Sequence, residues 1–266
     1  MSAQPTLEPI PYAVTTEGET LTFNPSIDGH FLVVGAVGSG KTAMMTAIIR
    51  RAAAQGARVW VCDPLRTEFA DLASWPNVEA VASTVDDITQ IIHTAHRAME
   101  QRLSALMNGA VTRADLEPIC VVLNEPRRMS GDADPRQLAS LDRKAEEITR
   151  IGRSVRIHLV AGTSYAPPRV LAAFPIRCSL GRFSRKDSSR MWGSPEATDH
   201  VEGRGPGVGT AYGHGGPTAI RVLAEDSAPA VTGRLGSGRG YSLRAAFTQA
   251  PTAPSHEVVE PRQSLG

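Results

Sequence analysis

The sequence predicts an α/β protein in which a mostly parallel central sheet is flanked by helices. Two observations lead to this prediction. Short, continuously apolar segments recur along the chain, as expected for strands that are buried on both faces. Between them lie longer stretches in which apolar residues repeat with helical periodicity. Strands and helices that alternate in this way favour a parallel sheet covered on both sides.

The length, composition and net charge of the chain limit its domain organisation and its partners. A length of 266 residues suits one substantial α/β domain with extensions and is marginal for two domains. The chain is 41% hydrophobic and 21% charged, which is typical of a soluble globular protein. A net charge of +1 argues neither for nor against a nucleic-acid partner, so any basic surface must be a local patch.

The expected elements follow one another from the first residues onward. Residues 19–23 alternate in polarity and could form an edge strand or a hairpin. An apolar run at 31–34 ends in glycines, and a helix is expected to follow at 42–54. Further strands are expected at 58–62, 78–82, 119–123, 157–161, 176–183 and 219–223, and further helices at 86–107, at 138–153 and from about Asp187. Thr84 is the expected N-cap of the helix at 86–107, and Asn108-Gly109 its expected stop.

Composition divides the chain into three parts. Residues 1–16 read as a polar N-terminal arm, residues 17–225 as the α/β domain, and residues 226–266 as a flexible tail rich in proline, serine and glycine. The start has no signal-peptide pattern, and no apolar run approaches the roughly 18 residues of a membrane span. The three cysteines, Cys62, Cys120 and Cys178, lack metal-ligand spacing. We therefore expect a cytoplasmic protein with reduced core cysteines.

The glycines after the apolar run at 31–34 belong to a phosphate-binding motif. The segment 35–42, Gly-Ala-Val-Gly-Ser-Gly-Lys-Thr, matches G-x-x-x-x-G-K-[ST] completely, between an expected strand and an expected helix. The expected nucleotide contacts are Gly35, Val37, Gly38, Ser39, Gly40, Lys41 and Thr42. Lys41 would reach the β- and γ-phosphates, and Thr42 would offer its hydroxyl to Mg²⁺. The motif predicts binding of ATP with Mg²⁺, against the alternative of a chance glycine turn.

A second acidic site is expected at the end of another strand. The apolar run at 119–123 is followed by Asn124 and Glu125. Glu125 is the candidate general base for water attack, and the alternative is a solvated loop carboxylate. Asn124 stands where an aspartate normally holds the metal-bound water, so it would be a metal-shell residue without negative charge. Mg²⁺ binding is therefore expected to be weakened.

Several further segments resemble one family when they are taken in order. They are His30 to Gly35 with the phosphate loop, Cys62-Asp63-Pro64 with Glu68, Ala98-Met99-Glu100 with Arg102, the run from Arg150 to Val160, Pro175 with Arg177, Ser184 with Asp187-Ser188, and Gly205 to Gly209. Together they resemble the FtsK/SpoIIIE-type DNA translocases, in the HerA–FtsK branch of P-loop ATPases. The likeness includes actinobacterial relatives in conjugation and type VII secretion, and it covers about residues 17–223.

The resemblance implies a RecA-like P-loop NTPase fold and an ATP-driven motor, here reduced to the motor core. Members of the family usually form homo-oligomeric rings, commonly hexamers, that move double-stranded DNA or drive transfer across a membrane. Arg153 occupies the position of the family's arginine before the strand at 157–161, which makes it a candidate inter-subunit finger. A helix-end arginine that caps carbonyls or pairs with glutamate is the alternative.

Two departures from the family favour a second hypothesis. Ser164 stands where the family has a glutamine that senses the γ-phosphate, and its side chain is too short to reach without a water. Asn124 is the other departure. The chain could therefore be a hydrolysis-deficient, nucleotide-binding structural or regulatory subunit of a DNA-transfer or secretion machine. A small-molecule kinase is disfavoured, because no arginine-rich lid or acceptor-binding segment stands out.

Two smaller features carry alternatives of their own. Arg182, Arg185, Lys186 and Arg190 form a basic cluster that could contact a DNA backbone or could be a solvated face. His158 lies in an apolar strand and is interpreted as a core or edge histidine rather than as a catalyst.

Overall fold

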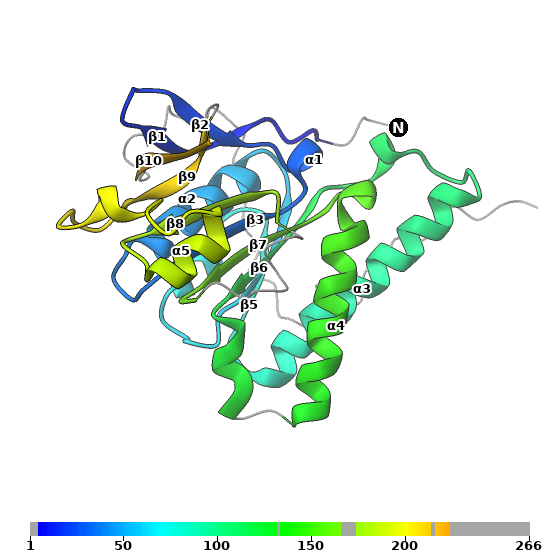
Figure 1. Cartoon of the computed structure of the whole chain (residues 1–266). Helices are drawn as coiled ribbons and strands as arrows, with labels where there is room; N and C mark the ends of the chain where they lie inside the picture. The colour runs from blue at the N-terminus through cyan, green and yellow to red at the C-terminus, as the bar shows by residue number, and fades with distance from the viewer. Residues whose placement is uncertain (1–4, 132–133, 166–173, 214–215, 224–266) are drawn as a thin grey trace, which may run out of the picture.

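The computed structural model describes residues 5–131, 134–165, 174–213 and 216–223 (Figure 1). They form a ten-stranded sheet in the order β2-β1-β10-β9-β8-β3-β7-β6-β4-β5. The strands are β1 (Ile10–Thr15), β2 (Thr20–Phe23), β3 (Phe31–Gly35), β4 (Arg58–Cys62), β5 (Val78–Ala82), β6 (Ile119–Asn124), β7 (Ile157–Thr163), β8 (Ile176–Leu180), β9 (Val208–Gly213) and β10 (Gly216–Val222). The helices are α1 (Pro25–Asp28), α2 (Lys41–Ala54), α3 (Val85–Met107), α4 (Pro135–Ile151) and α5 (Arg185–Trp192).

The run of strands from β8 to β5 is parallel, and helices cover both of its faces (Figure 1). In β3, Phe31 and Val33 pack into a core with α2, whereas Leu32 and Val34 pack into a second core with α3 and α4. Successive side chains of a strand point to opposite faces, which explains why such a strand is apolar throughout. The predicted α/β fold with a mostly parallel sheet is confirmed.

The other four strands add an antiparallel section to the sheet. β9 pairs with β8, and β10, β1 and β2 follow in antiparallel pairs. Because residues 10–15 form β1, the sheet begins before residue 17, where the domain was expected to start. β9 was not expected, since glycines interrupt its pattern. A Cβ on Gly209 would lie 2.0 Å from the carbonyl oxygen of Ser179, so glycine is what allows β9 to approach β8.

The sheet order brings the ends of four strands together. The register pairs Val34 of β3 with Thr163 of β7, and Asn124 of β6 with Gly162 of β7. Cys62, the last residue of β4, pairs with Leu123 of β6. The carboxyl ends of β3, β7, β6 and β4 therefore meet at one edge, which is where parallel α/β sheets bind ligands.

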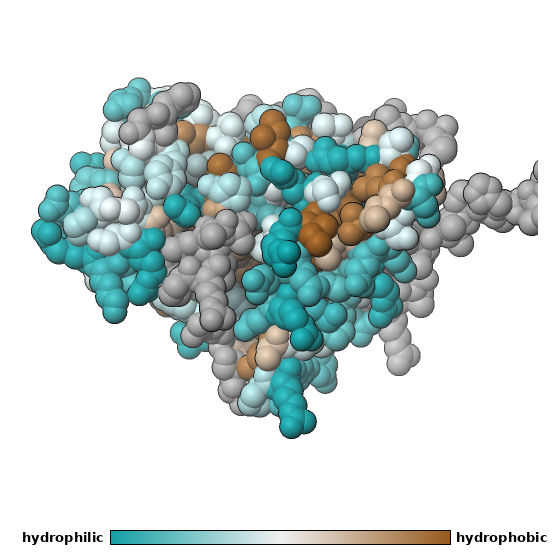
Figure 2. All heavy atoms as spheres, turned by 45° about the vertical axis from the view of Figure 1, so that its right-hand side comes forward, coloured by the Kyte–Doolittle hydropathy of each residue, from teal (hydrophilic) through white to brown (hydrophobic). Residues whose placement is uncertain are grey.

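Local signals fix several of the elements. The side chain of Thr84 accepts a hydrogen bond from the Asp87 backbone and caps α3 as expected, and Asn108 follows its last residue. The three cysteines are free and buried, as expected. Among the described residues, no helix is both long and apolar enough to cross a bilayer. The face in Figure 2 is largely polar, with hydrophobic side chains gathered in small patches. The expected tail at 226–266 lies outside the described residues.

Candidate functional site

The phosphate loop connects β3 to α2 through a backbone that requires glycine. β3 ends at Gly35, and α2 begins at Lys41. Gly38 and Gly40 have φ values of 79° and 101°, in the left-handed region that side chains disfavour. Val37 is 83% exposed at the tip of the loop. The loop therefore delivers the positive end of α2 to the carboxyl edge of the sheet, as anion binding requires.

A second glycine-rich turn packs against this loop. The N–H of Gly207 donates to the carbonyl of Ser39, 2.8 Å away. A Cβ on Gly40 would lie 3.0 Å from the Gly207 nitrogen, so the two backbones are in contact. The sequence resemblance located this turn along the chain, but only the fold shows that it supports the phosphate loop.

Lys41 pairs with Glu125 in the interior of the site. Lys41 Nζ lies 3.3 Å from Glu125 Oε1, and the two side chains are 7% and 9% exposed. Lys41 Nζ also lies 3.4 Å from the carbonyl of Ala36. Glu125 has a φ of 42°, and its N–H donates to the carbonyl of Gly162 on β7. Glu125 is therefore a buried, positioned carboxylate and not the solvated loop carboxylate of the alternative reading.

Ser164 holds Glu125 from the other side. Its backbone N–H lies 3.1 Å from Glu125 Oε2, and its hydroxyl donates to Glu125 Oε1. Ser164 follows β7, the strand next to β6, which places it beside Glu125. In this structure the position assigned to the family's γ-phosphate sensor contacts the candidate base instead.

Thr42 and Asn124 share the carboxylate of Glu68, which follows β4, and Asn124 also contacts that of Asp63. Thr42 Oγ1 donates to Glu68 Oε2 at 2.9 Å. Asn124 Nδ2 donates to the same oxygen at 2.9 Å and to Asp63 Oδ1 at 3.1 Å. The sequence patterns named Asp63 and Glu68 only as part of a family motif. Sequence reasoning did not place them beside the phosphate loop, because that contact depends on β4 lying next to β6.

The residues at this edge fit a nucleotide with a divalent cation. Ser39 Oγ and Asn124 Oδ1 are buried and have no hydrogen-bond partner in the described part of the chain. Such orphaned atoms cost about 1–3 kcal/mol each, which a bound ligand or its water would recover. Among the described residues no three His, Cys, Asp or Glu side chains form a metal site. Mg²⁺ commonly binds through one or two carboxylates and completes its shell with phosphates and water.

Arg153 is not brought to this site. It lies in the 3₁₀ turn Gly152–Val155, before β7 and therefore at the opposite edge of the sheet. Its Nη1 donates to the carbonyl of Ile27 at 2.9 Å. Within one chain, Arg153 therefore binds backbone and does not approach the phosphate loop.

Two histidines are buried in the same half of the molecule as Arg153. His158 Nδ1 lies 3.0 Å from the carbonyl of Gly29, and the N–H of Leu159 donates to His30 Nδ1 at 2.9 Å. Burial lowers the pKa of His30 from 6.5 to about 4 and that of His158 to about 3. His158 is thus a core histidine, as its sequence setting indicates.

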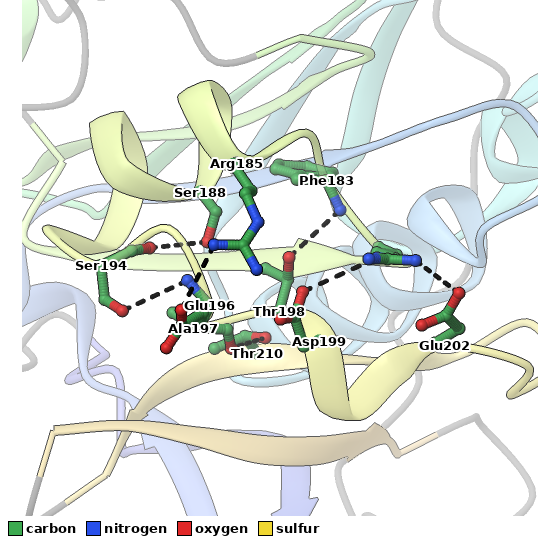
Figure 3. A network of polar contacts seen from close by, with 11 residues as sticks. Phe183, Arg185, Ser188, Ser194, Glu196, Ala197, Thr198, Asp199, Glu202 and Thr210 are labelled. Carbon is green, nitrogen blue, oxygen red and sulfur yellow. Dashed lines mark hydrogen bonds and ion pairs between the residues drawn. The ribbon is translucent and has the colours of Figure 1, made fainter.

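The basic cluster of the sequence is largely ion-paired, and Figure 3 draws Arg185 beside Glu196 as part of this network. Arg182 pairs with Glu202 and lies 3.7 Å from Asp199, and Arg185 pairs with Glu196 at 3.3 Å. Arg190 pairs with Asp187 at 3.2 Å. Because acidic partners offset these charges, the arrangement favours a solvated face over a DNA-backbone contact at this place.

Comparison with known proteins agrees with the motifs. Residues 8–118 match the model of the FtsK/SpoIIIE family. The chain is 24% identical over 221 residues to the DNA translocase FtsK of Tropheryma whipplei, covering 72% of this chain and 29% of that protein. The chain spans 37% or less of the length of each curated relative it matches.

Solved structures share the fold. The conjugation coupling protein TcpA of pCW3, in its monomer form with ATPγS, superposes with a TM-score of 0.69 at 17% identity, covering 80% of this chain and 65% of that one. The cytoplasmic domain of the type VII secretion ATPase EccC of Thermomonospora curvata gives 0.67 at 17% identity, covering 99% and 33%. These likenesses confirm a P-loop ATPase fold. The resemblance seen in the motifs is confirmed as well, because residues 8–118 match the FtsK/SpoIIIE family model and the curated relatives include DNA translocases named FtsK.

Proposed function

We propose that this chain is an ATP-driven motor that couples ATP hydrolysis to the movement of double-stranded DNA, assembled as a homo-oligomeric ring, most simply a hexamer. The observation that supports catalysis best is the buried contact between Lys41 and Glu125, which puts a phosphate-binding cation and a candidate base at one point. The DNA substrate rests on the family match and on the DNA translocases among the relatives.

The phosphate loop, Lys41 and Glu125 each have a separate role in hydrolysis. The loop N–H groups and Lys41 bind the β- and γ-phosphates, and Glu125 takes a proton from the attacking water. Lys41 contacts Glu125, so a phosphate that binds Lys41 would compete with this carboxylate for the ammonium group. If Lys41 moves to the phosphate, Glu125 still accepts hydrogen bonds from Ser164, at Oε2 from the N–H and at Oε1 from the hydroxyl.

A divalent cation, when bound, would neutralise the charge that develops on the phosphates. Thr42 supplies a hydroxyl for it, and Asn124 presents a carbonyl oxygen that accepts from a metal-bound water. Asn124 orients neighbouring groups through its Nδ2 donor without adding charge.

Arg153 would complete a site on a neighbouring subunit. Arg153 lies at the sheet edge opposite the phosphate loop, so it does not reach the nucleotide of its own subunit. A finger role therefore requires a ring in which this edge of one subunit faces the phosphate loop of the next. The competing role is structural, because the guanidinium already binds the carbonyl of Ile27.

The second candidate function is a nucleotide-binding structural or regulatory subunit that does not hydrolyse ATP. The observation that favours it is the pair of changes at one edge, Asn124 in the metal shell and Ser164 beside Glu125. A subunit of this kind would dock to a partner motor.

Steady-state ATP hydrolysis, with and without double-stranded DNA, separates the two. A motor gives turnover that rises with DNA and disappears in Lys41→Ala. ATP binding with no turnover in either condition would support the structural subunit. Protein that neither binds DNA nor forms oligomers with nucleotide would contradict the motor.

A further inference from the structure

A compact polar cluster lies under the start of α2, formed by Thr42, Asp63, Glu68 and Asn124. Asp63 and Asn124 are each 1% exposed. Glu68 Oε2 accepts from both Thr42 Oγ1 and Asn124 Nδ2, each at 2.9 Å. One carboxylate oxygen therefore touches the hydroxyl expected to bind Mg²⁺ and the residue that replaces the metal-shell aspartate.

The two carboxylates of the cluster have different tasks. Asp63 Oδ1 accepts from Asn124, and its Oδ2 lies 3.1 Å from the Glu68 backbone N–H and 3.3 Å from that of Phe69. Asp63 is therefore occupied in shaping the loop after β4. Both hydrogen bonds to the Glu68 carboxylate in the described contacts use Oε2 and come from neutral donors. Of the two carboxylates, that of Glu68 is therefore the one available to bind a cation.

The identity of residue 124 fits this arrangement. An amide at this position donates to both carboxylates, whereas an aspartate would place a third negative charge against them in a buried site. The buried Asn124 Oδ1 has no partner among the described residues, which leaves it an acceptor for a water on a bound cation.

We propose that Glu68 supplies the carboxylate of the divalent-cation site, in place of the aspartate whose position Asn124 occupies. Thr42 and the nucleotide phosphates provide other oxygens, in the manner usual for Mg²⁺, and Asn124 is a positioning residue. The inference rests on the proposed function only in assuming that ATP binds together with a divalent cation. It holds for the motor and for the structural subunit alike.

The test measures binding and does not depend on turnover. The affinity for ATPγS is determined by calorimetry in Mg²⁺ and in EDTA, and the ratio of the two gives the contribution of the cation. Glu68→Gln should reduce that ratio by about tenfold or more, with affinity in EDTA preserved. The double variant Glu68→Gln/Asn124→Asp moves the charge to residue 124 and should restore the ratio. Asp71→Asn, at a carboxylate 63% exposed in the adjoining turn, is the matched control and should leave it unchanged.

Asn124→Asp alone gives a second readout that does not require Glu68→Gln to fold. Three carboxylates would then meet without a cation, so its Tm in EDTA should fall below that of the parent, and Mg²⁺ with ATPγS should close the gap. An unchanged ratio in Glu68→Gln, or an unchanged Tm in Asn124→Asp, would overturn the proposal. The parent protein could bind ATPγS in a Mg²⁺-dependent way and still show no DNA-stimulated hydrolysis. That result would contradict only the proposed motor function.

Discussion

The ammonium of Lys41 lies 3.3 Å from the carboxylate of Glu125, with both side chains almost wholly buried. The contact joins the first residue of α2 to the residue after β6, so it depends on the tertiary structure rather than on either motif. The two expected catalytic charges are therefore held as a pair in the interior of the site. The first two predictions follow from this pair.

Lys41→Met should destabilise the protein as well as abolish nucleotide binding. The change leaves the carboxylate of Glu125 buried without its cation, which costs about 3 kcal/mol, at the low end because Ser164 still donates to it. Urea denaturation measures the loss, and Lys41→Arg, which keeps the charge, is the control. A loss below about 1 kcal/mol would show that the ion pair is exposed to solvent in solution.

Glu125→Gln should keep ATP binding and lose hydrolysis. The amide preserves the shape of the site but cannot accept a proton, so turnover should fall by roughly 10²- to 10⁴-fold. The measurement is single-turnover hydrolysis of bound ATP, and Glu117→Gln, at a half-exposed carboxylate away from the loop, serves as control. Equal turnover in parent and Glu125→Gln would remove Glu125 from the mechanism.

Gly40→Ala should weaken ATPγS binding, because it adds a steric contact with Gly207 to the strain of a positive φ. Its φ is 101°, and an added Cβ would come within 3.0 Å of Gly207. Gly203 also has a positive φ, 71°, but a Cβ there meets nothing within 4 Å. Gly203→Ala therefore carries only the strain of about 1–2 kcal/mol. We expect ATPγS affinity to drop more than about tenfold in Gly40→Ala alone. Equal affinities would show that the contact with Gly207 does not shape the loop.

Subunit mixing tests Arg153. If Arg153 acts on a neighbour's nucleotide, Arg153→Ala and Lys41→Ala should each be inactive, yet their mixture should recover part of the activity. Recovery arises where an intact Lys41 faces an intact Arg153 across an interface. Mixtures that stay inactive, together with a lower Tm for Arg153→Ala, would assign Arg153 to its hydrogen bond with Ile27.

The free energy of unfolding should fall as the pH drops below about 6.5. In this range the pKa values of the two buried histidines lie below the value of 6.5 in the unfolded chain. The unfolded histidines gain protons below pH 6.5, while His30 resists protonation to about 4 and His158 to about 3. The unfolded state therefore binds more protons, and each histidine costs up to about 1.4 kcal/mol per pH unit in that window.

The comparison of parent with His158→Asn isolates this effect, because the carboxylates titrate alike in both proteins. The asparagine amide can still donate to the carbonyl of Gly29. Urea midpoints between pH 7 and 4.5 should decline less steeply in the variant. Identical slopes would mean that His158 does not stay neutral.

The main features of the fold and of the nucleotide motif could be predicted because they are local. The phosphate loop is recognised from a glycine-rich run between an apolar strand and an amphipathic helix. The start of α3 is recognised from Thr84, whose side chain caps the helix. β9 was missed, because its glycines serve a close approach to β8 and carry no pattern of polarity.

The sequence by itself determined the residue types of the site, including Lys41, Glu125 and the uncharged Asn124. The tertiary structure decided their partners, because the order β3-β7-β6-β4 places strands side by side that are distant in the chain. That order sets Ser164 against Glu125, and Glu68 against Thr42 and Asn124. Local periodicity describes which face of a strand is buried, but it carries no information about which strand lies next to it.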